Sequence, residues 1–178
     1  ITLSTVINGD ASNPSKGKVV ATGNTGYVGG IIGRLKGSYE TIESSNYGSI
    51  TANNVSETDS TGYIGGIIGH LSNTFEIGVN GSIINGSSGY IESEANFVGG
   101  IIGYANAAIT SKGLISNVAN IVGAHYVGGI IGYANSDITF QSNITNSGAI
   151  MVTGNRIGGI IGYANKTTTM VAATNSGV

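Results

Sequence analysis

An eight-residue block of apolar residues and glycines recurs five times along the chain. It consists of Gly, Asn or His, then an aromatic residue (Arg156 in the last copy), then Val or Ile, and then Gly-Gly-Ile-Ile-Gly. The copies occupy residues 26–33, 62–69, 96–103, 125–132 and 155–162. Their Gly-Gly pairs begin at residues 29, 65, 99, 128 and 158, so the repeat length varies between 29 and 36 residues. A constant block between segments of variable length predicts a repeat fold with one fixed strand per turn and variable loops.

The segments around the block have the pattern of short strands. In the fourth repeat, residues 126–133 form an apolar run, residues 138–140 alternate, and residues 149–152 form a third apolar run. Asn, Ser, Asp and Gly lie between these runs and favour turns, whereas no window shows the helical period. We therefore predict an all-β protein, a parallel β-solenoid (β-helix) of about five to six turns with roughly three short strands per repeat. Residues 1–178 would form a single repeat domain, which we expect to be a fragment of a longer array.

A second, weaker pattern lies between the blocks: an Asn or Ser, a Gly, and an aliphatic residue two positions later. We identify its copies as residues 46–50, 80–83, 111–115 and 146–150, with truncated copies at 16–19 and 175–178. The longer insertions in the first two repeats are expected at residues 36–49 and 72–93, where binding specificity would vary.

Alternation along the block leaves two interpretations of its faces open. One face carries Val28 and Ile32 with their equivalents, and we predict that it forms the core. The other face carries an aromatic residue and the first Ile of each copy. If this face is exposed, it forms an apolar contact surface; if the Gly-Gly pair bends the strand, both Ile series lie in a broad core. The residues of this possible contact face are Tyr27, Tyr63, Phe97, Tyr126, Ile31, Ile67, Ile101, Ile130 and Ile160.

Two further series follow the block. Arg34, His70, Tyr104, Tyr133 and Tyr163 occupy one position, and the three tyrosines are either a structural stack or a platform for sugar binding. The other series, Asn106, Asn135 and Asn165, predicts a ladder of amide hydrogen bonds between turns.

Composition narrows the functional classes. The chain has 31 Gly, one Pro and no Cys among 178 residues, and only 9% of the residues are charged. Without Cys there are no disulfides, thiolate nucleophiles or thiolate metal ligands. A net charge of −2 with seven Lys and Arg argues against nucleic-acid binding. No apolar run is long enough to span a membrane. We expect no cofactor and no metal.

Candidate catalytic groups are few. Glu40 and Glu76 lie at the same distance past their blocks and would stack on adjacent turns, as a glycosidase or Ca²⁺ site requires. Thr110, Thr139 and Thr169 take that position in later repeats and suggest, more weakly, a Thr face of the ice-binding kind. His70 and His125 occupy different repeat positions, so they predict neither a shared metal site nor a catalytic triad.

The Val-Gly-Gly-Ile-Ile-Gly block with an intervening Asn-x-Gly-x-Ile resembles the GLUG motif. That repeat occurs in large secreted and surface proteins, including adhesin-like proteins and the non-catalytic parts of immunoglobulin-A-cleaving peptidases. The resemblance covers nearly the whole chain, although Ile-Ile replaces the usual Leu-Val and the first two repeats lack the Tyr-Ala-Asn tail. No His-Glu-x-x-His is present, so the peptidase activity does not carry over.

The resemblance implies a non-catalytic structural or adhesive segment of an extracellular or cell-surface protein, such as a stalk or a filament building block. Its expected partners are other copies or flanking repeats of the chain, and a host or matrix glycan or protein. The alternatives are a carbohydrate-binding or carbohydrate-cleaving β-helix and an ice-binding solenoid.

Overall fold

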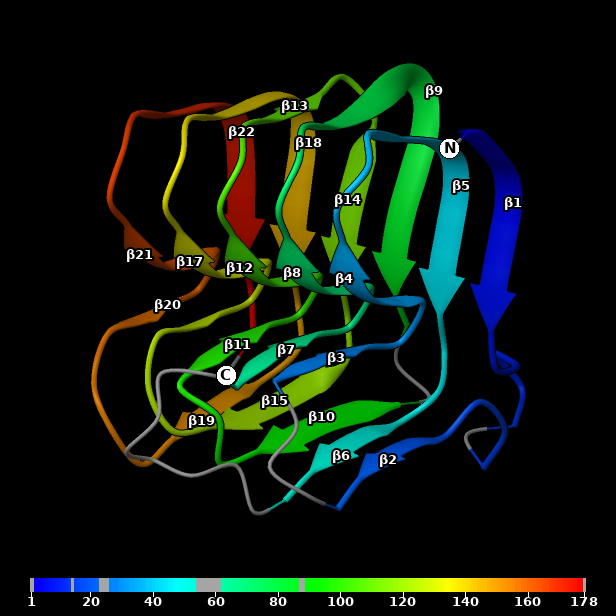
Figure 1. Cartoon of the computed structure of the whole chain (residues 1–178), viewed down its shortest axis with the longest axis vertical. Coiled ribbons are helices and arrows are strands. Elements are labelled where there is room, and N and C mark those ends of the chain that lie inside the picture. The colour runs from blue at the N-terminus through cyan, green and yellow to red at the C-terminus, as the bar shows by residue number, and fades with distance from the viewer. Residues whose placement is uncertain (1, 14, 23–25, 54–61, 87–88, 178) are drawn as a thin grey trace.

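The computed structural model describes residues 2–13, 15–22, 26–53, 62–86 and 89–177. Within these ranges all regular secondary structure consists of β-strands. The strands form four parallel sheets in which each strand pairs with its equivalents one turn earlier and later (Figure 1). The predicted parallel β-solenoid is therefore confirmed, and it has about five turns. No helix in the described residues has the length and hydrophobicity needed to cross a bilayer.

Each sheet takes one strand or strand pair from every turn. The first sheet contains β1 (Thr2–Asn8), β5 (Tyr39–Asn46), β9 (Phe75–Asn85), β13 (Ile109–Ser111), β14 (Leu114–Asn117), β18 (Ile138–Asn146) and β22 (Thr168–Asn175). The second contains β2 (Val19–Ala21), β6 (Ile50–Ala52), β10 (Tyr90–Ser93), β15 (Asn120–Gly123) and β19 (Ile150–Val152). The third contains β3 (Tyr27–Gly29), β7 (Tyr63–Gly65), β11 (Phe97–Gly99), β16 (Val127–Gly128) and β20 (Ile157–Gly158). The fourth contains β4 (Ile32–Leu35), β8 (Ile68–Leu71), β12 (Ile102–Ala105), β17 (Ile131–Ala134) and β21 (Ile161–Ala164).

The glycine block is a strand that folds back on itself as a narrow arch. Its first half lies in the third sheet and its second half in the fourth, with the second Gly and the first Ile at the tip. Glycine is required because the two arms approach backbone to backbone: a Cβ on Gly69 would lie 2.7 Å from the carbonyl oxygen of Tyr63. Counted as one bent strand, the block gives three strands per turn; counted as two halves, it gives four sheets.

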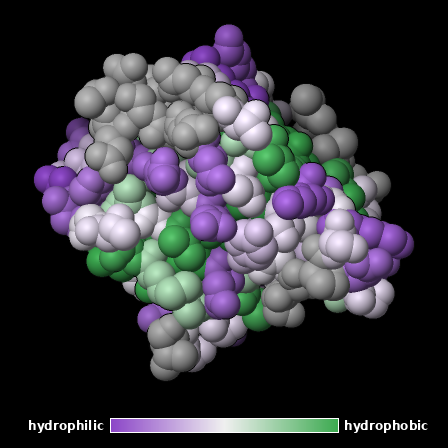
Figure 2. Space-filling model, turned by 90° about the horizontal axis from the view of Figure 1, so that it is seen from below, coloured by the Kyte–Doolittle hydropathy of each residue, from purple (hydrophilic) through white to green (hydrophobic). Residues whose placement is uncertain are grey.

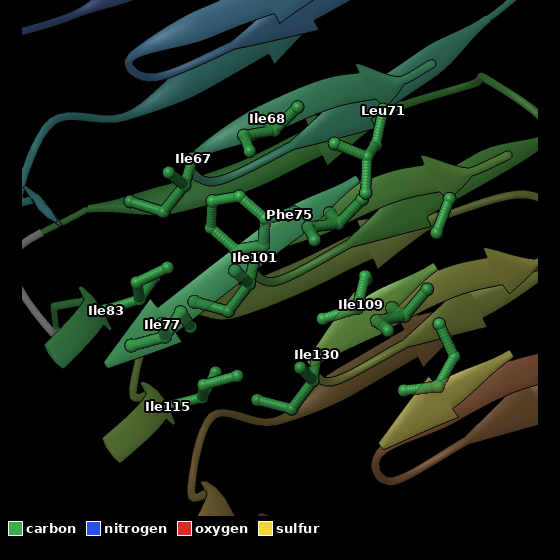
Figure 3. Packing of buried hydrophobic residues seen from close by; sticks show 14 of the residues in the cluster. Ile67, Ile68, Leu71, Phe75, Ile77, Ile83, Ile101, Ile109, Ile115 and Ile130 are labelled. Carbon is green, nitrogen blue, oxygen red and sulfur yellow. The ribbon is translucent and has the colours of Figure 1, made fainter. Parts of the chain in front are cut away.

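The arch divides the interior into two apolar cores. The larger core lies between the first and fourth sheets and contains Phe75, Phe140 and the isoleucines of the arch tip. Figure 3 shows Ile67, Ile101 and Ile130 one above another, directed toward Phe75, Ile77 and Ile115. The smaller core lies between the second and third sheets and contains Val28, Ile50, Ile64, Ile91, Val98, Ile121 and Val127.

This arrangement decides between the two interpretations of the block. Ile67, Ile101 and Ile130 are at most 1% exposed, and Ile31 and Ile160 in the end turns pack against the same core. The interpretation in which the first Ile of each block forms an exposed contact face is therefore wrong. Strict alternation fails because the chain reverses at the glycines, which turns both Ile series toward the larger core.

Two smaller predictions are corrected by the strand register. Asn85, not Asn80, is the equivalent of Asn46, because residues 78–81 form a bulge opposite the single residue Ile42 of β5. In the next turn the equivalent is Asn117 rather than Ser111. The extra length of the first repeat does not lie within residues 36–49, where β5 pairs with β1 without a register shift. It lies in the segment between β6 and β7, most of which is outside the described residues.

The molecule is wider than its stack is long. Its longest axis, vertical in Figure 1, runs along the strands of the first sheet, whereas the turns stack across the view from β1 to β22. Five rungs at about 4.8 Å give roughly 24 Å along the stack. These turns alone therefore form a short, broad block.

Candidate functional site

Two aromatic columns close the open side of the arch. Tyr27, Tyr63, Phe97 and Tyr126 lie where the first arm begins, and His70, Tyr104, Tyr133 and Tyr163 lie in the second arm. We call these eight side chains the aromatic ridge. Rings stack within each column, with centroids 5.4 Å apart for Tyr27 and Tyr63 and 5.1 Å apart for Tyr104 and Tyr133. Rings meet edge to face between columns, as Tyr63 does with Tyr104 at 5.0 Å. Both geometries are favoured by the ring quadrupole.

An arginine covers each end of the ridge. The Arg34 guanidinium lies 4.9 Å from the Tyr27 ring centroid, and the Arg156 guanidinium lies 4.7 Å from that of Tyr126. Arg34 occupies the second column in the first turn, whereas Arg156 occupies the first column in the last turn. These cation–π contacts explain how two arginines are accommodated in positions otherwise filled by rings.

The stacking argues against the tyrosines as a sugar platform. Sugars bind aromatic residues through an exposed ring face, but the faces of Tyr104 and Tyr133 cover one another with an interplanar angle of 18°. Burial raises the pKa of Tyr63, Tyr104 and Tyr133 above the ordinary value, so these hydroxyls stay protonated at neutral pH.

His70 is the most perturbed titratable group of the ridge. It is 7% exposed, stacks on Tyr104 and shares a 2.7 Å hydrogen bond between Nδ1 and the Ser72 hydroxyl. Burial, reinforced by the Arg34 charge, lowers the pKa of His70 to about 4. His70 is therefore neutral at physiological pH and serves as an aromatic member of the column.

A second ladder, made of asparagines that are buried in all but its first and last members, lies at the corner between the first and second sheets. Within each pair of successive turns, Nδ2 of one Asn donates to Oδ1 of the next at 2.7–2.8 Å. The members are Asn8, Asn46, Asn85, Asn117, Asn146 and Asn175. The second Nδ2 hydrogen binds a backbone carbonyl of the same turn, as in Asn117 to Ala119 at 2.9 Å. This arrangement satisfies both amide hydrogens in a buried site.

The tip of the arch contacts this ladder. A Cβ on Gly100 would lie 2.5 Å from Cγ of Asn117 and 2.0 Å from the carbonyl oxygen of Gly129. The other four second glycines of the blocks meet the ladder in the same way. Sequence reasoning found Asn46, Asn146 and Asn175 only as turn residues and missed the ladder. The available signal was an Asn 16 to 19 residues after the second Gly of every block.

The predicted ladder of Asn106, Asn135 and Asn165 is confirmed at the surface. Nδ2 of Asn135 donates to Oδ1 of Asn106 at 2.8 Å, and Nδ2 of Asn165 donates to Oδ1 of Asn135 at 2.9 Å. Its donors point toward the N-terminal turn, opposite to those of the buried ladder.

The predicted stacking of Glu40 on Glu76 is also confirmed, since these residues are partners in the register of β5 and β9. Thr110, Thr139 and Thr169 continue the same column on the outer face of the first sheet. The two carboxylates line a shallow hollow with Ile77, Gly78, Thr110 and Lys112. In the part of the chain that the structure describes, no three potential ligands gather as a metal site would need.

The lateral surface of the second sheet is mixed in character. Val20, Thr51, Glu92, Val122 and Met151 form one outward column, so polar side chains interrupt the apolar ones. Seen from below, the hydrophobic surface occurs in small patches separated by hydrophilic groups (Figure 2). Comparison with family models, curated proteins and solved structures finds no match to this chain.

Proposed function

We propose that the chain is a non-catalytic structural segment of an extracellular or cell-surface protein, whose role is to hold attached parts at a fixed spacing or to display its loops for adhesion. The supporting observation is that several continuous ladders tie each turn to the next. The parallel strands, the buried Asn ladder, the aromatic ridge and the two cores all run through the stack. Bending at any one turn would break all four sets of contacts, so the stack resists bending.

The resemblance of the block to GLUG repeats supports the extracellular placement, since those repeats occur in secreted and surface proteins. The low charge fits the same role. Residues at one repeat position lie directly above one another, and like charges in such a column repel. Protease shaving of intact cells that express the parent protein tests this placement: release of fragments from this region is expected, and full protection of the region contradicts it.

The stiffness is testable by distance measurement. Thr5 and Ala172 lie in one exposed column at opposite ends of the first sheet. The chain contains no Cys, so Thr5→Cys and Ala172→Cys can be spin-labelled selectively. Pulsed electron paramagnetic resonance should give one narrow distance distribution centred near roughly 24 Å plus the label lengths. A broad or bimodal distribution would contradict the proposed spacer role.

A carbohydrate-active surface is the second candidate, favoured by the register that pairs Glu40 with Glu76. Paired carboxylates are the groups that glycosidases use. A polysaccharide depolymerisation assay distinguishes the two functions. Turnover that disappears in Glu40→Gln or Glu76→Gln would overturn the non-catalytic role.

An ice-binding surface is the third candidate, because Thr110, Thr139 and Thr169 form one column on the outer face of the first sheet. Glu40 and Glu76 interrupt that column in the earlier turns, which disfavours it. Under the structural role we expect no thermal hysteresis, and a measured hysteresis gap would support the ice-binding function instead.

A further inference from the structure

We propose that the aromatic ridge carries single oxidising equivalents from turn to turn and collects them as a tyrosyl radical on Tyr104 and Tyr133. The substrate is an external one-electron oxidant, such as an activated haem peroxidase. This activity goes beyond the structural role proposed above and does not depend on it. The inference starts from the geometry of the ridge, since an electron passes readily between aromatic rings that lie in contact.

A continuous series of tyrosines, which we call the tyrosine path, has one member in each of the five turns. The first step joins Tyr27 to Tyr63, with ring centroids 5.4 Å apart. The second joins Tyr63 to Tyr104 at 5.0 Å and crosses from one column to the other, where the first column carries a phenylalanine. Steps of 5.1 Å and 5.0 Å then lead through Tyr133 to Tyr163. These are the distances of interacting aromatic pairs, so no step needs an intermediate group.

Tyrosine is the side chain from which an oxidant would most readily take an electron in this protein. The chain contains no Cys and no Trp, which are oxidised as easily as tyrosine, and only two Met. Six of its nine tyrosines belong to the aromatic ridge, and each of the six is at least partly exposed. Water can therefore take up the phenol proton that leaves with the electron. The six are Tyr27, Tyr63, Tyr104, Tyr126, Tyr133 and Tyr163.

The two arginines of the ridge decide where the radical collects. The Arg34 guanidinium lies 4.9 Å from the Tyr27 ring centroid. The Arg156 guanidinium lies 4.7 Å from the centroid of Tyr126 and 5.8 Å from that of Tyr163. Removing an electron from a ring lowers its electron density and weakens the attraction of the cation above it. Tyr27 and Tyr163 are therefore harder to oxidise than the middle of the tyrosine path.

The middle of the path lacks this opposing charge. Among the residues that the structure describes, no arginine lies over the ring of Tyr104 or Tyr133. The neighbour of Tyr104 in the second column is His70, which is neutral because burial lowers its pKa to about 4. Tyr104 and Tyr133 also stack on one another with an interplanar angle of 18°, so their overlapping faces can share the unpaired electron. A radical that enters at either side is thus drawn to this pair.

The steps conserve atoms and electrons. At the entry residue, Tyr27 or Tyr163, the oxidant gains one electron, and the phenol O–H bond breaks as its proton passes to water. In each later step the next tyrosine gives one electron to the radical and its phenol proton to water, while the former radical oxygen takes a proton from water. The products are one reduced oxidant and one neutral radical on Tyr104 or Tyr133. An external reductant such as ascorbate returns the electron, and a proton from water restores the phenol.

The test uses the 178-residue chain with a photo-oxidant at one chosen position. Because the chain has no Cys, Lys36→Cys or Lys166→Cys can be labelled selectively with a ruthenium complex. Both lysines are exposed, Lys36 in the first turn and Lys166 three residues after Tyr163. A light flash with an electron acceptor oxidises the complex, and a nitroso spin trap captures the tyrosyl radicals. Mass spectrometry of peptides then locates the adducts.

A control label lies away from the ridge. Asn120 is exposed and is the partner of Tyr90 in the register of β10 and β15, and Tyr90 is not part of the tyrosine path. From Asn120→Cys we expect adducts on Tyr90 and none on the ridge. From Lys36→Cys and from Lys166→Cys we expect adducts mainly on Tyr104 and Tyr133, although these two labels lie in opposite end turns.

Substitutions on and beside the path separate conduction from direct attack. Tyr133→Phe should abolish the Tyr104 adducts formed from position 166, because phenylalanine gives up an electron far less readily than tyrosine. The matched control Tyr126→Phe removes a ring that contacts Tyr133 at 5.3 Å but lies off the path, so the Tyr104 adducts should persist. Unchanged circular dichroism establishes that each variant is folded.

Two results would overturn the proposal: adducts confined to the tyrosine beside each label, or equal effects of Tyr133→Phe and Tyr126→Phe. Arg34→Gln tests the role of the charge, because adducts formed from position 36 should then extend to Tyr27. An unchanged adduct distribution in Arg34→Gln would overturn the collection of the radical at the middle pair. The spin-label distance tests the spacer role separately, so either idea can fail without the other.

Discussion

Removing one member of the buried Asn ladder should be far more damaging than removing one from the exposed ladder. Asn117 is fully buried and takes part in three hydrogen bonds, with Asn85, Asn146 and Ala119. In Asn117→Ala these three partners lose their contacts where water has no ready access. A buried group left unpaired costs about 1–3 kcal/mol, so we expect a loss of about 3–5 kcal/mol in the free energy of unfolding.

The exposed ladder supplies the control. Asn135 makes two amide bonds of similar length to Asn106 and Asn165, but water replaces them when the side chain is removed. Asn135→Ala should therefore cost at most about 1 kcal/mol. Urea unfolding followed by circular dichroism measures both variants, and hydrogen exchange locates the loss. Equal effects, or a loss below about 1 kcal/mol for Asn117→Ala, would refute the role assigned to the ladder.

Two further predictions follow from the arch and the ridge. Gly100→Ala places a Cβ 2.0 Å from the carbonyl oxygen of Gly129, so it should lower the free energy of unfolding, measured in urea, by about 2–4 kcal/mol. A Cβ on Gly78 meets nothing within 4 Å, so the control Gly78→Ala should be neutral or slightly stabilising. Similar effects of the two substitutions would contradict the proposed close packing. The second prediction concerns His70, whose pKa is lowered to about 4 in the folded chain. Between pH 6.5 and 4 the unfolded chain therefore binds a proton at His70 and the folded chain does not. The free energy of unfolding should fall as the pH drops through this window. We expect the free energy of unfolding to fall by about 1–2 kcal/mol, because solvent near the surface screens part of the effect. Urea unfolding at several pH values should show a smaller pH dependence in His70→Tyr. An identical pH profile in that variant would contradict His70 as the cause.

The sequence was sufficient to predict the class of fold because its signal repeats in every turn. Five copies of one block with variable spacing indicate stacked equivalent strands, and the register confirms that the blocks lie directly above one another. The surface ladder of Asn106, Asn135 and Asn165 was predictable for the same reason, since these residues lie at a constant distance from the block. Positions tied to the block by short, constant segments can thus be aligned without a structure.

The reversal inside the block could not be derived from alternation. Alternation assumes an extended strand, in which side chains point to opposite faces in turn. Gly29 and Gly30 allow the chain to turn back, so the direction of the Ile31 side chain depends on the arch and no longer on its place in the alternation. The buried Asn ladder was missed because its distance from the block changes with the bulge in β9. Insertions therefore limit how far from the block the equivalent residues of different turns can be aligned from the sequence alone.

The contact between the arch tip and the Asn ladder explains why the block itself does not vary while the loops do. Gly100 reaches Asn117 across the interior, and both lie on the boundary between the two cores. A larger residue at the tip would displace the amide, and an amide out of line would lose its partners in both neighbouring turns. A misplaced amide in one turn would therefore disturb the next turn as well, so every turn of the stack has to keep the same glycine and asparagine. Asn175 lies beside Gly159 and accepts from Asn146, so the requirement is still met in the turn that carries the fifth block.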